Sequence, residues 1–249
     1  MKTFKKILFL CTLLLVVLNL NVSVKASSGW GFRKNKEHKI PDIGLYASEI
    51  KDLAYYVGPE EKTIYLTFDV GYDNGNLDKI LDTLKEEDIK ATFFVTGDFV
   101  ERFPELLKRI SNEGHLIGNH TYNHKDITKL SYEELERELV SLDNKVCEVT
   151  GRNIDHYFRP PEGTFDRKSL ENVKKLGYET VFWSIAYVDW HQDKEFGRDY
   201  VLKNVINHLH DGAICLMHIV SHDNANYLSD VIKEIRNNGY QIKNLDSFI

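Results

Sequence analysis

The feature that most constrains the fold is a repeated alternation between short apolar segments and longer amphipathic ones. The short segments are rich in β-branched and aromatic residues, whereas the longer ones repeat apolar residues at spacings of three and four, which is typical of helices. Strands that alternate with helices predict parallel β-α units. The predicted strands are 64–68, 91–95, 116–119, 157–159, 180–185, 213–218 and 240–244, and the predicted helices are 77–87, 104–112, 131–150, 167–176, 199–208 and 224–237.

Seven parallel strands fit either a closed barrel or an open wound sheet. Polar residues that suit catalysis follow several different strands, and the active sites of α/β barrels collect at such carboxyl ends. We therefore predict an α/β fold, a distorted (β/α) barrel of about seven parallel strands formed by residues 62–249. Residues 27–61 are expected to be an irregular lead-in docked on the barrel, and no linker or repeat indicates a second domain.

The first 26 residues predict export from the cytoplasm. A basic start at Lys2, Lys5 and Lys6 precedes an almost wholly apolar run over 7–18, and the small residue Ala26 offers a cleavage site. The alternative is an uncleaved membrane anchor, but a spanning helix needs roughly 20 apolar residues. We expect cleavage after Ala26, no stable membrane anchor, and a secreted or cell-envelope location.

The charge balance bears on the class of partner. The first 26 residues carry four lysines and no acid, so 28 basic and 38 acidic residues remain, a net charge of −10. An acidic exported protein is unsuited to nucleic acid or to anionic surfaces, whereas a neutral polymer such as a polysaccharide is acceptable. Cys147 and Cys215 lie in apolar segments without paired spacing, so we expect two buried core residues and no disulfide framework.

Side chains that could take part in catalysis or metal binding follow five of the predicted strands. A lone acid after a strand is usually a turn residue, and a lone histidine is usually a satisfied core group. Asp189 has the further alternative of capping the next helix. Together, however, a carboxylate and a histidine pair supply a base for water and nitrogens for a metal. The residues concerned are Asp69, His120, His124, Arg159, Asp189 and His218.

These residues lie in five ordered motifs, and with them the chain resembles the polysaccharide deacetylase family, carbohydrate esterase family 4, also called the NodB-homology domain. The motifs are Thr-Phe-Asp-Val-Gly at 67–71, His-Thr-Tyr-Asn-His at 120–124, Arg-Pro-Pro-Glu-Gly at 159–163, Asp-Trp at 189–190 and Leu-Met-His at 216–218. Segments 30–32, 65–72, 181–184, 188–190 and 218–224 are similar to the delta-lactam-forming peptidoglycan de-N-acetylases of endospore formers.

The resemblance implies a division of roles. Asp69 would be the general base for water, held ionised by Arg159, and His120 and His124 would bind a divalent metal. His218 would be the general acid that protonates the leaving amine, with Asp189 orienting its ring, and the backbone N–H of Gly71 or Tyr72 could help bind the oxyanion. Trp190, Tyr72, Pro160 and Gly163 would bind the substrate, whereas Phe158 and Trp183 are assigned to the core.

One position departs from the family pattern. The family has a second aspartate, a metal ligand, where this chain has Val70, so we expect a weakly held divalent ion such as zinc on the two histidines. The implied substrate is a peptidoglycan glycan strand, stripped of peptide, whose N-acetylmuramic acid is deacetylated on the way to the muramic delta-lactam of spore cortex. The alternatives are a chitin-oligomer or xylan deacetylase, and a catalytically inactive glycan-binding domain.

Overall fold

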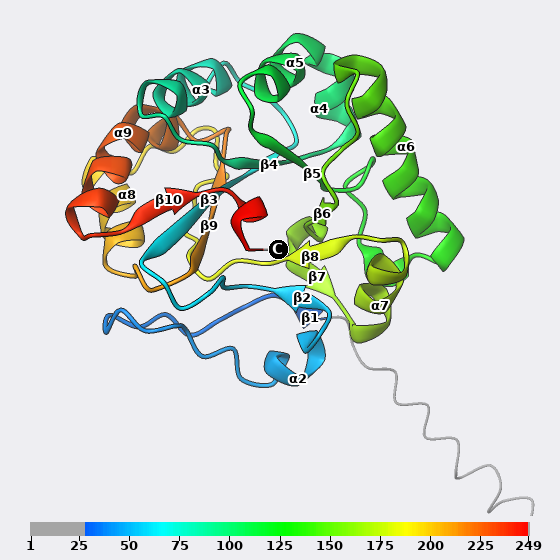
Figure 1. Ribbon diagram of the computed structural model, residues 1–249, viewed down its shortest axis with the longest axis horizontal. Coiled ribbons are helices and arrows are strands. Elements are labelled where there is room, and N and C mark those ends of the chain that lie inside the picture. Colours follow the sequence, from blue (N-terminus) through cyan, green and yellow to red (C-terminus); the bar gives the residue numbers. More distant parts are fainter. Residues whose placement is uncertain (1–27, 249) are drawn as a thin grey trace, which may run out of the picture.

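Parallel strands form the centre of the protein. The structure, a computed structural model, describes residues 28–248 and contains an eight-stranded sheet curled into a barrel with helices outside it (Figure 1). The predicted barrel and its seven strands are confirmed, and a two-residue strand, β2, joins them. The strands are β2 (Ala54–Tyr55), β3 (Thr63–Val70), β4 (Thr92–Val95), β5 (Leu116–Asn119), β6 (Tyr157–Phe158), β8 (Glu179–Val181), β9 (Ala213–His218) and β10 (Gln241–Lys243).

The strand order places β3 at the centre of the site. The sheet runs β10-β3-β4-β5-β6-β8-β2, and β9 pairs with β3 over its whole length, with Asp69 opposite His218. Among residues 28–248, two isolated bridges to β9 close the ring: a parallel one between Ile185 and Cys215 and an antiparallel one between Val57 and Ala213. The strand predicted over 180–185 is wrong in its extent, because β8 ends at Val181 and the next backbone N–H, that of Phe182, donates to Tyr55 of β2.

Helices follow the strands and cover the outside of the barrel. All six predicted helices are present, and Ser131 and Glu134 form the capping box that begins α6. A short helix, α4, was not predicted, and Cys147 on α6 is exposed, so its assignment to the core was wrong. The helices are α3 (Leu77–Glu86), α4 (Gly97–Arg102), α5 (Pro104–Asn112), α6 (Tyr132–Thr150), α7 (Arg167–Lys175), α8 (Arg198–Ile206) and α9 (His222–Asn237).

The two faces of β3 show how the core and the site are separated. Successive side chains of a strand point to opposite faces. Phe68 and Val70 face outward and join the core between strands and helices, where Phe68 stacks on Phe93 of β4 at 5.1 Å. Tyr65 faces the barrel interior, and Asp69 shares its parity. The interior face of β3 therefore delivers Asp69 to the carboxyl end of the barrel.

The lead-in, of which residues 28–61 are described, covers the side of the barrel between α7 and α8 (Figure 1). It contains β1 (Ser28–Gly29), which pairs antiparallel with β7 (Thr164–Phe165), and α2 (Tyr46–Ile50). Trp30 stacks on Phe182 at 4.4 Å, and its Nε1 donates to the carbonyl of Trp183 at 2.9 Å. Because β2 pairs with β8 and Val57 bridges to Ala213 of β9, the lead-in spans the seam where the ring is weakest.

The predicted signal peptide, residues 1–26, lies outside the described residues. Within residues 28–248, no helix is both long and apolar enough to cross a membrane.

Candidate active site

A pocket of about 620 Å³ opens at the carboxyl ends of the barrel strands. It lies where β3 and β9 end and where the loops after β5, β6 and β8 meet. This volume is within the usual range of ligand sites. Its lining residues are Asp69, Gly71, Tyr72, His120, His124, Glu162, Gly163, Trp183, Trp190, Leu216, His218 and Val220.

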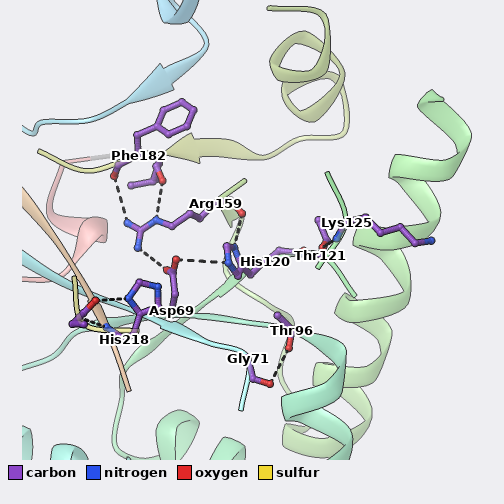
Figure 2. Close-up of polar contacts among 12 residues, drawn as sticks. Asp69, Gly71, Thr96, His120, Thr121, Lys125, Arg159, Phe182 and His218 are labelled. Carbon is purple, nitrogen blue, oxygen red and sulfur yellow. Dashed lines mark hydrogen bonds and ion pairs between the residues drawn. The ribbon is translucent and has the colours of Figure 1, made fainter. Parts of the chain in front are cut away.

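A buried ion pair holds the carboxylate at the base of the pocket. Arg159 is completely buried, and its Nη1 donates to Asp69 Oδ1 at 2.8 Å (Figure 2). Its Nε and Nη2 donate to the carbonyls of Val181 and Phe182 at 3.1 and 3.4 Å, and the guanidinium stacks over Phe94. Burial is the largest single influence and would raise the pKa of Asp69, but the charges of Arg159, His120 and His218 and the Arg159 hydrogen bond together hold that pKa below its usual range. Asp69 is therefore an ionised carboxylate in a fixed orientation.

The first histidine of the pair, His120, is oriented by the backbone of Arg159. His120 Nδ1 lies 2.7 Å from the carbonyl of Arg159, so Nδ1 carries the hydrogen and the lone pair of Nε2 is free (Figure 2). That Nε2 lies 3.6 Å from Asp69 Oδ2. Burial lowers the pKa of His120 to about 4, more than the Asp69 charge raises it. A neutral imidazole with a free lone pair is the form that binds metals.

The second histidine sits on a strained loop. His124 and Thr121 have left-handed backbone conformations, with φ of 52° and 60°, which are unfavourable for residues with a Cβ. Asn119 Oδ1 accepts from the N–H of Thr121 at 2.9 Å, and Glu138 of α6 accepts from the N–H of Asn123 at 2.8 Å. These bonds hold the loop so that the His124 ring lies 5.0 Å from that of His120, and both line the pocket.

The donor set fits only part of a metal site. Val70 is fully buried in the outer core and offers no ligand atom. Among residues 28–248, no three His, Cys, Asp or Glu side chains form a group that could hold an ion. Catalytic zinc sites usually have three protein ligands and an open position. His120 and His124 therefore fit an ion held by two imidazoles, with its other positions open to water or substrate.

A second charged pair, Asp189 and His218, lies beside the first, because His218 of β9 is paired with Asp69 of β3. Asp189 is buried, and its two oxygens accept from Nδ1 and the backbone N–H of His218 at 2.7 and 2.8 Å. Asn224 of α9 adds a third hydrogen bond to Asp189, at 2.7 Å. Burial is the largest single influence and would lower the pKa of His218, but the charge and hydrogen bond of Asp189, together with the Asp69 charge, raise that pKa. Asp189 contacts the histidine and does not cap α8, which begins nine residues later at Arg198.

The walls of the pocket include most of the residues expected to bind substrate. Trp190 is about half exposed and meets the His218 ring edge-on at 5.9 Å, and Tyr72 and Gly163 also line the pocket. Pro160 is buried and is not one of the residues that line the pocket in the described part of the chain. Trp183 packs against the core as expected, but it is only partly buried and also lines the pocket, whereas Phe158 is fully buried as expected.

Three features of the site were not predicted. Asn224 is fully buried and bonds both Asp189 and the carbonyl of His218, and Tyr187 in turn donates to Asn224 at 2.6 Å. For Asn224, the one indication in the sequence was the similarity of segment 218–224 to one subfamily, and that similarity did not suggest its role in holding Asp189. Glu162 was the variable position of the Arg-Pro-Pro-x-Gly motif; it has a left-handed φ of 56° and places an exposed carboxylate at the pocket.

The fold and the site define a class of protein: a barrel hydrolase with a carboxylate held by arginine and a facing imidazole held by aspartate. Residues 57–181 match the family model described as polysaccharide deacetylase. The chain belongs to the polysaccharide deacetylase family, carbohydrate esterase family 4, and is a hydrolase of carbon–nitrogen bonds.

Named relatives match almost the whole chain. The peptidoglycan-N-acetylmuramic acid deacetylase PdaA of Bacillus subtilis is 44% identical over 223 residues, which cover 88% of this chain and 85% of the relative. The solved structure of that protein, a family 4 carbohydrate esterase, matches with a TM-score of 0.86 and 45% identity over 89% of this chain and 96% of the other. A family 4 carbohydrate esterase from Bacillus anthracis matches with a TM-score of 0.74 and 39% identity, over 90% and 96%.

Proposed function

We propose that this protein is an exported peptidoglycan deacetylase that removes the acetyl group from N-acetylmuramic acid. The observation that carries the proposal is the similarity to a deacetylase named for that substrate, which extends over nearly the full length of both chains. The paired base and acid in one pocket support a hydrolytic role over glycan binding alone, because binding requires neither.

In the proposed reaction, Asp69 removes a proton from water as the water attacks the acetyl carbonyl. Arg159 keeps the carboxylate ionised and fixes its direction. His218 then gives its proton to the leaving nitrogen, since an amine leaves poorly unless it is protonated. Asp189 holds the imidazolium for that transfer. The products are acetate and a free amino sugar.

A divalent metal is part of the proposal. Deacetylases of this family are generally metal-dependent. His120 and His124 would hold the ion, which when bound would polarise the acetyl carbonyl and the water. Because Val70 supplies no ligand, we propose that this chain holds the ion more weakly than a three-ligand site would.

We further propose that the substrate strand has lost its peptide at the reacting sugar. A free lactyl carboxyl then remains beside the new amine, and the two can condense, with loss of water, to muramic delta-lactam. In cells, the protein would act outside the cytoplasm during the formation of spore cortex.

Two measurements test the proposal. Purified protein should release acetate from peptide-free glycan strands faster than from intact peptidoglycan or from oligomers of N-acetylglucosamine. Cortex from cells without the gene should lack muramic delta-lactam. An unchanged level of the lactam in those cells would refute the assignment. Acetate release confined to N-acetylglucosamine oligomers would mean that the enzyme acts on N-acetylglucosamine instead.

A further inference from the structure

A second groove adjoins the catalytic pocket on the side of Trp190. It has a volume of about 380 Å³ and shares three wall residues, Trp183, Trp190 and Leu216, with the pocket. All of its lining residues lie outside the segment that matches the family model. We call it the lead-in groove, and define it by Phe32 and Lys34 of the lead-in, Val188 and Trp190 of the loop after β8, and Tyr200 and Asn204 of α8.

The groove has an apolar wall that is exposed. Val188 and Trp190 of this wall are 37% and 52% exposed. Phe196, which lies on the same segment between β8 and α8 but does not line the groove, is 45% exposed. Phe196 stacks on Tyr200 at 4.5 Å. Asp223 of α9 accepts from the backbone N–H of Phe196 at 2.6 Å, which fixes the end of this segment. Exposed aromatic faces held in place suit the apolar C–H faces of a sugar ring.

The groove also carries polar groups for hydroxyl or carboxylate oxygens. Lys34 is the one charged side chain among its described lining residues. Its Nζ donates to the carbonyl of Ala186 at 2.6 Å, and an ammonium has three donors, so two are left for a ligand. Asn204 adds an amide. By contrast, the depression on the opposite flank, next to His124, is lined by Asp98 and Glu101.

We propose that the lead-in groove binds the sugar directly linked to the one being deacetylated. The inference rests on the proposed glycan deacetylase activity, because a strand with one sugar in the pocket must continue out of it. The shared wall of Trp183 and Trp190 makes the groove the continuation of the pocket. The linked sugar lies against Trp190, and Lys34 and Asn204 bind its oxygen atoms.

The test compares substrates of two lengths on the full secreted chain. Lys34→Met and Asn204→Ala are assayed for acetate release from single N-acetylmuramic acid and from a peptide-free tetrasaccharide. We expect kcat/KM on the tetrasaccharide to fall roughly 3- to 10-fold, the weight of one hydrogen bond, mainly through KM. The value on the single sugar should stay unchanged. Lys79→Met, which also removes an exposed lysine with one hydrogen bond, to the side chain of Asn226, is the matched control.

A second measurement does not depend on turnover. Calorimetric titration with the deacetylated tetrasaccharide should show the same 3- to 10-fold loss of affinity in both variants, and none in the control. Equal effects on both lengths would mean that Lys34 only anchors the lead-in, and no effect on either length would also overturn the proposal. If the wild-type protein acts only on N-acetylglucosamine, the proposed substrate fails, and the same length comparison with that sugar still decides the role of the groove.

Discussion

Replacing Asp69 by Asn removes the charge that neutralises a guanidinium buried completely inside the barrel. Arg159 keeps its hydrogen bonds to two backbone carbonyls and its stacking on Phe94, but those neutral groups do not balance its charge. Breaking a buried pair in this way costs about 3–5 kcal/mol. The amide of Asn can still accept one hydrogen bond, so we expect the lower end, about 3 kcal/mol.

For a chain of this size that loss lowers the melting temperature by about 6–12 °C, at roughly 2–4 °C per kcal/mol. Activity should fall about 10²- to 10⁴-fold because the base is lost. The assays are chemical denaturation, thermal melting and acetate release, each on the wild type, Asp69→Asn, Arg159→Met and the double variant.

The double variant separates charge from catalysis. Once Arg159 is also replaced, no uncompensated cation remains. The double variant should therefore lose about 1–3 kcal/mol less stability than the sum of the losses in the two single variants. Activity should remain lost. An Asp69→Asn variant as stable as the wild type, or losses that simply add, would refute the view that Asp69 neutralises Arg159 in the folded protein.

Other perturbations give further expectations. The pKa of Asp69 is lowered and that of His218 is raised, so kcat/KM should decrease only at a pH below the usual carboxyl pKa and at a pH above the usual histidine pKa. Asp189→Asn should move the alkaline limb of this pH profile to lower pH, and an unmoved limb would count against His218 as the acid. His124→Ala should reduce zinc retained after dialysis and lower activity by at least the 10- to 100-fold that outer partners of ligands cost, whereas full activity in chelator would exclude a metal role. Trp30→Ala should cost about 3–5 kcal/mol on denaturation, against less than about 0.5 kcal/mol for Leu45→Ala, an exposed control in the same lead-in; equal costs would mean that Trp30 does not anchor it.

The repeating pattern of the sequence was sufficient to predict the alternating strands and helices, because each carries its own periodicity. The choice of a barrel over an open sheet came from the polar residues that follow several strands. Short elements were missed: α4 spans only six residues, and β2 only two, so neither repeats a pattern. Strand 180–185 was predicted too long because its residues pair with different neighbours, first β6 and β2 at 180–181 and then, through Ile185, β9.

The motifs located the side chains that follow the strands, but not the groups behind them. Asn224 and Tyr187 support Asp189 from positions 35 residues downstream and two residues upstream, and no local spacing links the Asn to the Asp. Trp183 has a strongly apolar sequence context, so its place in the pocket wall depends on how the chain turns after β8. Docking of the lead-in was predicted, but its partners were not, because Trp30 meets a partner 153 residues away.

The position of β3 between β4 and β9 has a consequence for the order in which the protein is made. β3 is synthesised early, whereas β9 begins only at Ala213. Almost 150 further residues must therefore be synthesised after Asp69 before its neighbour His218 is present. Contacts so distant in sequence form slowly, because the chain must first close a long loop. The base and the acid therefore come together only after nearly the whole chain has emerged, and a shortened chain that ends before β9 has no assembled site to act prematurely.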